Sequence, residues 1–174
     1  MGDELVWQKI AEIVKGVSPA IYGSFNPPVD SGAIDKFERK LGVQLPDSFK
    51  AYLRTFNGQK PRGLPLCGYN RLLPINQIVQ TRKMRIELFS DEPPIAFLEE
   101  NKIQTTLWDK LWIPFADFEG SNSLVLDLHA GKNGKDGQII LLYSGIDMES
   151  DDVVIAPSFS AFGEEFLRRL ENGA

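Results

Sequence analysis

The chain has 174 residues, of which 43% are hydrophobic and 25% are charged. These are ordinary values for a globular domain with a sizeable core, so they exclude disordered and fibrous proteins, and residues 1–174 are expected to form one domain. The net charge of −5 disfavours nucleic acid as a partner, because binding phosphates requires clustered Lys and Arg.

The sequence gives no sign of a membrane or secretory route. The N-terminus MGDELVWQKI lacks the basic head and apolar run of a signal peptide, and no stretch approaches the roughly 18 apolar residues of a membrane span. Cys67 is the only cysteine, so no internal disulfide can form. We therefore expect a cytoplasmic protein.

Helical periodicity begins near the N-terminus. Residues 3–15 have one apolar face, and the Pro-rich residues 18–32 are expected to be an irregular connection. A second helix is predicted to begin at Asp30 or Ser31 and to end at Gly42.

The stretch 41–58 predicts a short helix that organises the core. Pro46 suits the first helical position, and Asn57 with Gly58 suits a left-handed stop. One helix face carries the apolar residues Phe49, Tyr52, Leu53 and Phe56. Because three of these are aromatic, this face is expected to be buried.

A Pro- and Gly-rich loop at 59–69 leads to a short strand around 71–73 and then to a helix from Ile75 to Phe89. The basic run TRKMR, residues 81–85, is interpreted as the solvated face of that helix, because basic residues without interleaved aromatics are poor support for nucleic-acid binding.

The second half of the chain has the pattern of strands. Four short runs rich in Ile, Val and Leu are separated by turn residues and lie at 112–115, 123–128, 138–143 and 152–156. A closing helix is predicted from SFSAFGEEFLRRLENG. These elements predict an α+β fold, with N-terminal helices packed on a twisted, mainly antiparallel sheet and the C-terminal helix completing the cover.

Residues 34–59 resemble the N-terminal signature of the SUKH superfamily, which holds the fungal SMI/KNR cell-wall regulators and many bacterial toxin-immunity proteins. The residues on its pattern are Ile34, Glu38, Leu41, Gly42, Leu45, Pro46, Asn57 and Gly58. Later stretches match in order, namely CGYNRLLPINQIVQ, WIP, LDL, GQII and APSF. Family members often carry Gly-Asp where this chain has Ser121-Asn122. The resemblance implies a protein-binding domain that is not an enzyme and needs no cofactor.

Charge is unevenly divided along the chain. Residues 1–87 hold 13 Lys and Arg against 8 Asp and Glu, a net +5, whereas residues 88–174 hold 6 against 16, a net −10. A partner-binding rim is predicted from Asp117, Glu119, Asp136, Asp147, Glu149, Asp151 and Asp152. Such a rim suits a basic protein, for example a basic toxin domain. The alternative is a solvated surface without a partner.

The sequence offers little material for catalysis. His129 is the only histidine, which excludes a multi-histidine metal site, and on a strand its side chain would leave on the same face as that of Asp127. This pair is the one candidate for an enzyme. The loop 130–137 resembles a phosphate loop only superficially, because Gly131 and Gly134 are too close for a Walker motif, and a hairpin turn is predicted.

The preferred function is that of an immunity protein, which neutralises a cognate bacterial toxin by direct binding. The first alternative is a scaffold or regulatory module like the fungal cell-wall regulators, and the second is an enzyme that uses His129 and Asp127. The sequence does not predict an oligomeric state or the identity of the partner.

Overall fold

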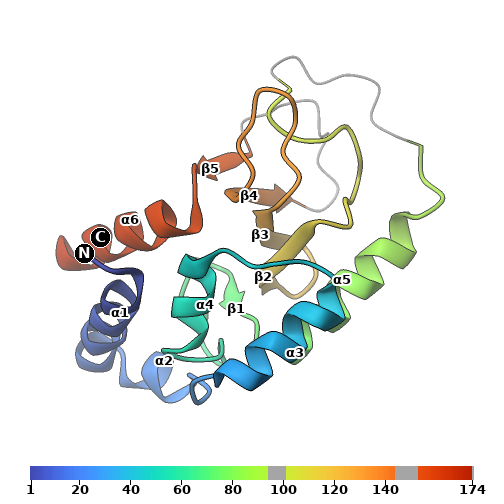
Figure 1. Ribbon diagram of the computed structural model, residues 1–174. Helices are drawn as coiled ribbons and strands as arrows, with labels where there is room; N and C mark the ends of the chain where they lie inside the picture. Colours follow the sequence, from blue (N-terminus) through green and yellow to red (C-terminus); the bar gives the residue numbers. More distant parts are fainter. Residues whose placement is uncertain (94–100, 144–152, 174) are drawn as a thin grey trace.

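The computed structural model describes residues 1–93, 101–143 and 153–173, and it confirms the α+β fold (Figure 1). The helices are α1 (Asp3–Val17), α2 (Pro19–Gly23), α3 (Ser31–Leu41), α4 (Asp47–Leu53), α5 (Ile75–Phe89) and α6 (Phe159–Glu171). The strands are β1 (Arg71–Leu72), β2 (Trp112–Phe118), β3 (Asn122–Asp127), β4 (Gln138–Tyr143) and β5 (Val154–Ala156). The predicted elements are present, and α2 is an addition within the connection predicted to be irregular.

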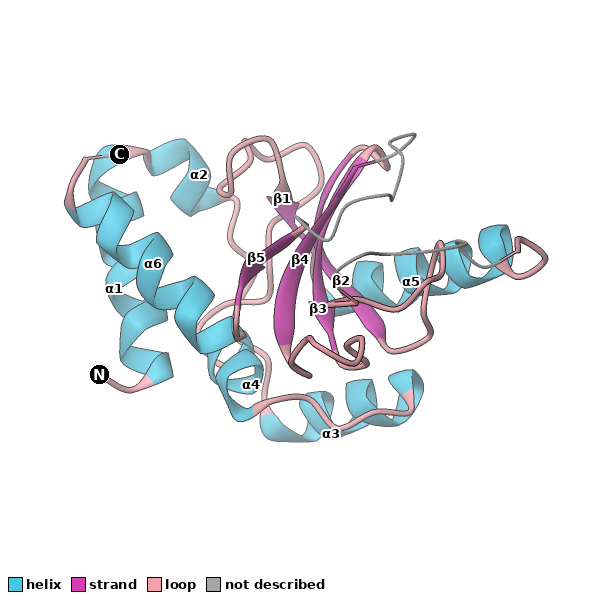
Figure 2. Cartoon of the chain, turned by 90° about the horizontal axis from the view of Figure 1, so that it is seen from above, coloured by secondary structure: helices cyan, strands magenta, loops and turns pink. Residues whose placement is uncertain are grey.

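The described strands form one antiparallel sheet in the order β1-β2-β3-β4-β5, so each strand pairs with its neighbours in the chain. In the centre of the sheet, Val125 lies opposite Pro114 on one side and Ile140 on the other. The register shifts between Pro114 and Ala116, and irregularities of this kind increase the local twist. Figure 2 shows the resulting curved sheet between two groups of helices. The predicted meander is confirmed.

The two faces of the sheet belong to different hydrophobic clusters. Leu124 and Leu126 point into the main core with residues of α1, α3, α4 and α6, whereas Val125 points into a second cluster with Trp108 and Trp112. Successive strand side chains alternate between faces, which explains this division. The sequence analysis did not predict the second cluster, to which the segment before β2 contributes Ile103 and Trp108.

The main core is centred on α4, as the sequence predicts. Phe49, Tyr52 and Leu53 of this helix are completely buried. Trp7 of α1 lies between Tyr52, at 4.7 Å between ring centroids, and Phe159 of α6, at 5.5 Å. These rings join the first and last helices of the chain, and each such aromatic pair contributes about 0.5–1.5 kcal/mol beyond its burial.

The predicted ends of α3 are confirmed, whereas the stop predicted at Asn57 and Gly58 is wrong, because α4 ends at Leu53 with Arg54 as its C-cap. Asp30 caps α3 by accepting a hydrogen bond from the Ala33 N–H at 2.8 Å, and Gly42 ends that helix with a φ of 70°. Gly58 has a φ of 58°, and a side chain there would overlap the backbone of Leu73. Pro46 is the N-cap of α4 and not its first helical residue.

Candidate functional site

The loop that leads into β1 is held by one buried side chain, that of Gln59. Its Nε2 donates to the Ser24 Oγ at 2.9 Å and to the Leu64 carbonyl at 2.7 Å, while its Oε1 accepts from the N–H groups of Leu66 at 3.2 Å and Leu72 at 3.0 Å. All the hydrogen-bonding capacity of this amide is therefore used within the protein. The loop is fixed at both its beginning and its end.

This loop presents Tyr69 to solvent. The backbone groups of Cys67 and Asn70 hydrogen-bond to each other in both directions, at 3.1 and 2.9 Å, so Gly68 and Tyr69 form the corner of a tight hairpin. Gly68 has a φ of 64°, which a glycine adopts without strain. Tyr69 is 75% exposed, and its ring lies 6.0 Å from that of the half-exposed Phe118 at the end of β2.

Tyr69 stands between two hollows of the surface. On one side, a groove of about 640 Å³ runs between α6, the β3–β5 part of the sheet and the hairpin. Its apolar walls include Leu66, Leu124, Leu141, Ile155, Phe162 and Phe166. On the other side, a smaller hollow of about 360 Å³ is lined by Arg62, Arg71, Asp117, Phe118 and Glu119. We call Tyr69 with these two hollows the Tyr69 surface.

Two of the predicted partner-binding residues thus belong to the Tyr69 surface. Both carboxylate oxygens of Asp117 accept from the Gly120 N–H, at 3.1 and 3.2 Å, which stabilises the β2–β3 turn. Partial burial raises the pKa of Asp117, and the Gly120 N–H and Arg85 oppose this shift. Glu119 is exposed and has a φ of 47°, a strained value for a residue with a side chain.

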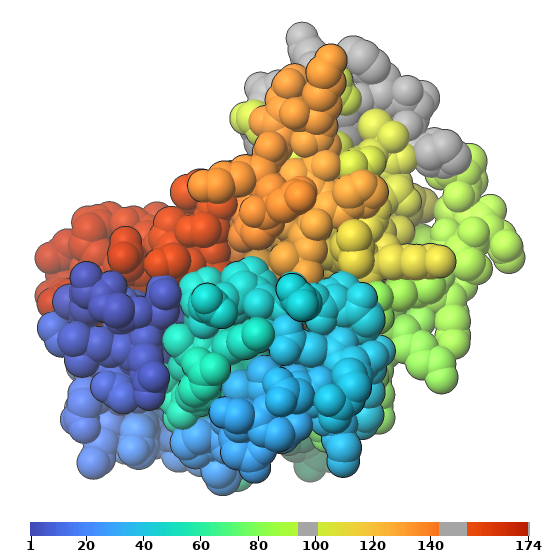
Figure 3. All heavy atoms as spheres, viewed as in Figure 1, coloured from blue at the N-terminus to red at the C-terminus, as the bar shows by residue number. Residues whose placement is uncertain are grey.

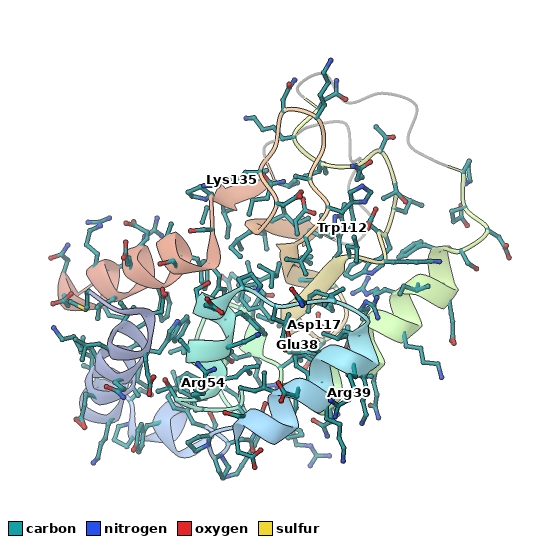
Figure 4. All side chains as sticks on the ribbon, in the orientation of Figure 1. Glu38, Arg39, Arg54, Trp112, Asp117 and Lys135 are labelled. Carbon is teal, nitrogen blue, oxygen red and sulfur yellow. The ribbon has the colours of Figure 1, made fainter. Side chains whose placement is uncertain are left out.

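The other predicted residues do not join them. Asp136 lies in the β3–β4 loop, at the opposite end of β3 from Asp117, and its Oδ1 accepts from the Ala130 N–H at 2.8 Å. Figure 4 shows this separation, because it labels Asp117 and also Lys135, the residue next to Asp136. In Figure 3 the β3–β4 loop projects from the molecule far from the helices of the N-terminal half. Asp147, Glu149, Asp151 and Asp152 lie outside the described residues.

His129 pairs with a different carboxylate from the one that the sequence predicts. Its Nδ1 lies 2.9 Å from the Oδ2 of Asp109, and its side chain is half exposed. Asp127 is buried instead, where it accepts from the backbone N–H of His129 and from the Gln138 amide. Burial raises the pKa of Asp127, and the Gln138 amide opposes this shift. The acid–base pair required by the enzyme alternative is therefore not formed by these side chains.

The basic run on α5 has specific contacts. Arg82 donates to the Lys110 carbonyl and Arg85 to the Gly120 carbonyl, each at 2.8 Å, and the Arg85 guanidinium lies over the ring of Trp108. Both arginines thus attach α5 to the segments around β2. Within the described ranges, no group of three His, Cys, Asp or Glu residues is arranged to hold a metal ion.

A family model described as the SMI1/KNR4 family (SUKH-1) matches residues 28–165. The chain belongs to this family. The match runs from just before α3 into α6 and includes the whole sheet and the Tyr69 hairpin. A search of curated proteins found no significant match. Membership in the SMI1/KNR4 family fits a protein-interaction domain that is not an enzyme. None of the helices in the described part of the chain is long and apolar enough to cross a membrane.

Sequence reasoning missed Tyr69 itself. The sequence analysis places it at the end of the loop 59–69 and gives it no role. Its position directly after Gly68 in a turn is the signal in the sequence, because an aromatic residue there has no helix or strand neighbours to cover it.

Proposed function

We propose that this SMI1/KNR4-family chain is an immunity protein, which neutralises a cognate bacterial toxin by binding it through the Tyr69 surface. The supporting observation is Tyr69 itself, whose backbone lies in a short hydrogen-bonded hairpin and whose side chain is mostly exposed. A Tyr side chain has only two χ angles, so it supplies a large contact area to a partner at a low cost in conformational entropy.

The composition around Tyr69 is that of a binding interface. Two large apolar residues, Phe118 and Ile155, are exposed along the two hollows. Arg62 and Arg71 lie in the smaller hollow. Tyr, other aromatic residues and Arg are enriched in interface centres, and hot-spot residues are predominantly Trp, Tyr and Arg.

The charge distribution supports a basic partner. Residues 88–174 carry a net −10, although the Tyr69 surface itself is close to neutral, with Asp117 and Glu119 beside Arg62, Arg71 and Arg169. The excess negative charge elsewhere in this half supports a cationic partner through long-range steering, which raises association rates by about 10- to 1000-fold in favourable cases. That the acidic residues at 147–152 contact the partner stays a prediction. Reversal of all four carboxylates to Lys tests it, with the salt dependence of partner binding as the measurement.

The proposal is tested by growth rescue. A toxin domain encoded beside the gene for this chain is produced in a bacterial host, alone and together with the chain. Wild-type chain is expected to restore growth, and Tyr69→Ala is expected to fail at the same protein level. Leu88→Ala is the matched control, because Leu88 is an exposed apolar residue of α5 outside both hollows. Failure of the wild-type chain to restore growth would contradict the proposal, and binding to a host protein instead would favour the regulatory alternative.

A further inference from the structure

We propose that Asn172, the residue directly after α6, is a site of spontaneous deamidation, whereas the fold protects the two other Asn-Gly pairs of the chain, Asn57-Gly58 and Asn133-Gly134. The three pairs share one chemistry, because in each of them Asn is followed by Gly. They differ in their surroundings, which therefore decide how fast each pair reacts in the folded protein.

Deamidation begins with an attack within the chain. The backbone nitrogen of the residue after Asn forms a bond to the carbonyl carbon of the Asn side chain. The bond from that carbon to the amide nitrogen breaks, and ammonia leaves with the proton of the attacking N–H. Water then opens the cyclic imide at either carbonyl and gives Asp or isoaspartate. A following Gly favours the attack, because no Cβ obstructs the approach and its backbone turns freely.

The Asn172-Gly173 pair is open to this attack. Both residues are exposed, and the Asn172 side chain has no hydrogen bond to any described residue. Within the described chain, the N–H of Gly173 is held by one bond, to the Leu170 carbonyl at 3.2 Å. A Cβ placed on Gly173 would meet no atom within 4 Å, so nothing is packed against this backbone. Because helix ends fray at little cost in free energy, the nitrogen is readily released.

The Asn57-Gly58 pair is locked on both sides. The Asn57 Oδ1 accepts from the Ile75 N–H at 2.9 Å, and the Asn57 carbonyl accepts from the Asn26 side chain at 3.0 Å. Gly58 is buried, and its backbone runs so close to Leu73 that a Cβ would lie 2.5 Å from the Leu73 carbonyl carbon. The attacking nitrogen can therefore turn only when the core opens, which is rare in a domain of ordinary stability.

The Asn133-Gly134 pair lies in the exposed β3–β4 loop, but it is tied to the segment before β2. The Asn133 N–H donates to the Asn101 carbonyl at 2.9 Å, and the Gly134 N–H donates to the Gly131 carbonyl at 3.0 Å. A Cβ on Gly134 would overlap the Lys102 carbonyl oxygen, so the loop packs directly against this backbone. Exposure alone does not make this pair reactive, because the loop must first detach.

Deamidation of Asn172 changes the charge near the larger groove. The product carries a carboxylate three residues after Arg169, which lines that groove. Arg169 donates to Glu165, and the new carboxylate is a second acceptor at a spacing that brings side chains together at a helix end. The new charge also lies at the C-terminal end of α6, where the helix dipole disfavours an anion.

The test follows all three pairs in one sample. The full chain is incubated under native conditions at mildly alkaline pH, and peptide mapping by mass spectrometry measures the loss of each amide with time. A parallel sample in guanidinium chloride gives the rate of each pair in the unfolded chain, where the three pairs are expected to react at similar rates.

The ratio of the two rates reports the protection of each pair. Folding is expected to slow Asn172 by no more than about fivefold, the effect of one hydrogen bond. It is expected to slow Asn133 by about 30-fold or more, because two such bonds must open. For Asn57, which requires the core to open, the expected factor is about 1,000-fold or more.

Asn172→Asp is the matched variant, because it carries the charge of the product and has no amide at this site. Ion-exchange chromatography of aged wild-type chain is expected to show an acidic species with the charge of this variant. Slowing of Asn172 by about 30-fold or more on folding would overturn the inference, and so would loss of the Asn57 or Asn133 amide as fast as that of Asn172 in the folded chain. The immunity function is tested separately by growth rescue.

Discussion

Replacing Gln59 by Leu is expected to be the most damaging single polar substitution in the loop that carries Tyr69. The change keeps the approximate size of the side chain but removes hydrogen bonds to Ser24, Leu64, Leu66 and Leu72. The N–H groups of Leu66 and Leu72 then lose their acceptor in a place where water does not replace it, because Gln59 is 1% exposed.

The magnitude follows from those two donors. Each buried N–H without an acceptor costs about 1–3 kcal/mol, so the loss is expected to be about 2–6 kcal/mol, a large part of the 5–15 kcal/mol that stabilises a typical domain. Equilibrium urea unfolding measures this as a lower transition midpoint at an unchanged slope. Gln8→Leu, at an exposed position of α1, is the matched control and is expected to stay within about 0.5 kcal/mol of the wild type. A loss below about 1 kcal/mol for Gln59→Leu would refute the role given to this amide.

Three further predictions concern stability. Burial raises the pKa of Cys67 from 9.0 to about 12, so the thiol ionises at a lower pH in the unfolded chain than in the folded one, and the free energy of unfolding falls as pH rises above 9. Between pH 9 and 10, the wild type is expected to lose about 1 kcal/mol more than Cys67→Val. Urea unfolding at each pH measures this difference. Glu119→Gly is expected to raise the free energy of unfolding by about 0.5–1 kcal/mol, because glycine adopts a positive φ without strain. Gly120→Ala, at a φ of 80°, is expected to lower it by about 1 kcal/mol. Thermal unfolding measures both, and equal stabilities would contradict the strain assigned to this turn. Gly134→Ala is expected to cost about 2 kcal/mol or more in urea unfolding, because its Cβ would overlap the carbonyl oxygen of Lys102, and an unchanged midpoint would show that this contact yields.

The sequence predicted the fold well where a local rule decides the structure. Phe49 and Tyr52 are buried because one face of α4 carries them, and Asp30 and Gly42 act at the ends of α3 for reasons of local backbone geometry. The stop predicted at Gly58 is wrong, because α4 ends at Leu53, and the left-handed Gly58 instead lets the chain pass close to the backbone of Leu73. The strands were predicted from their apolar runs. The strand pattern also places Val125 on the face opposite to Leu124 and Leu126. That this second face is buried as well could not be predicted, because it depends on which segments cover it.

The candidate site was predicted less well, because it depends on contacts between distant residues. Asp117 and Glu119 are near Tyr69 because β1 pairs with β2, and Asp136 is far away because β3 separates the two turns. Likewise, spacing along a strand favoured Asp127 as the partner of His129, whereas the fold brings Asp109 to the imidazole. Spacing along the chain gives no access to such pairings.

The central claim, that the Tyr69 surface binds the partner, is tested most directly by the affinity of Tyr69→Ala for the cognate toxin domain, measured by titration calorimetry beside Leu88→Ala. Loss of a central aromatic anchor typically costs 2 kcal/mol or more, so we expect Tyr69→Ala to bind about 30-fold more weakly or worse while its urea unfolding midpoint is unchanged. Leu88→Ala is expected to bind as the wild type does. An affinity of Tyr69→Ala within about twofold of the wild type would contradict the account.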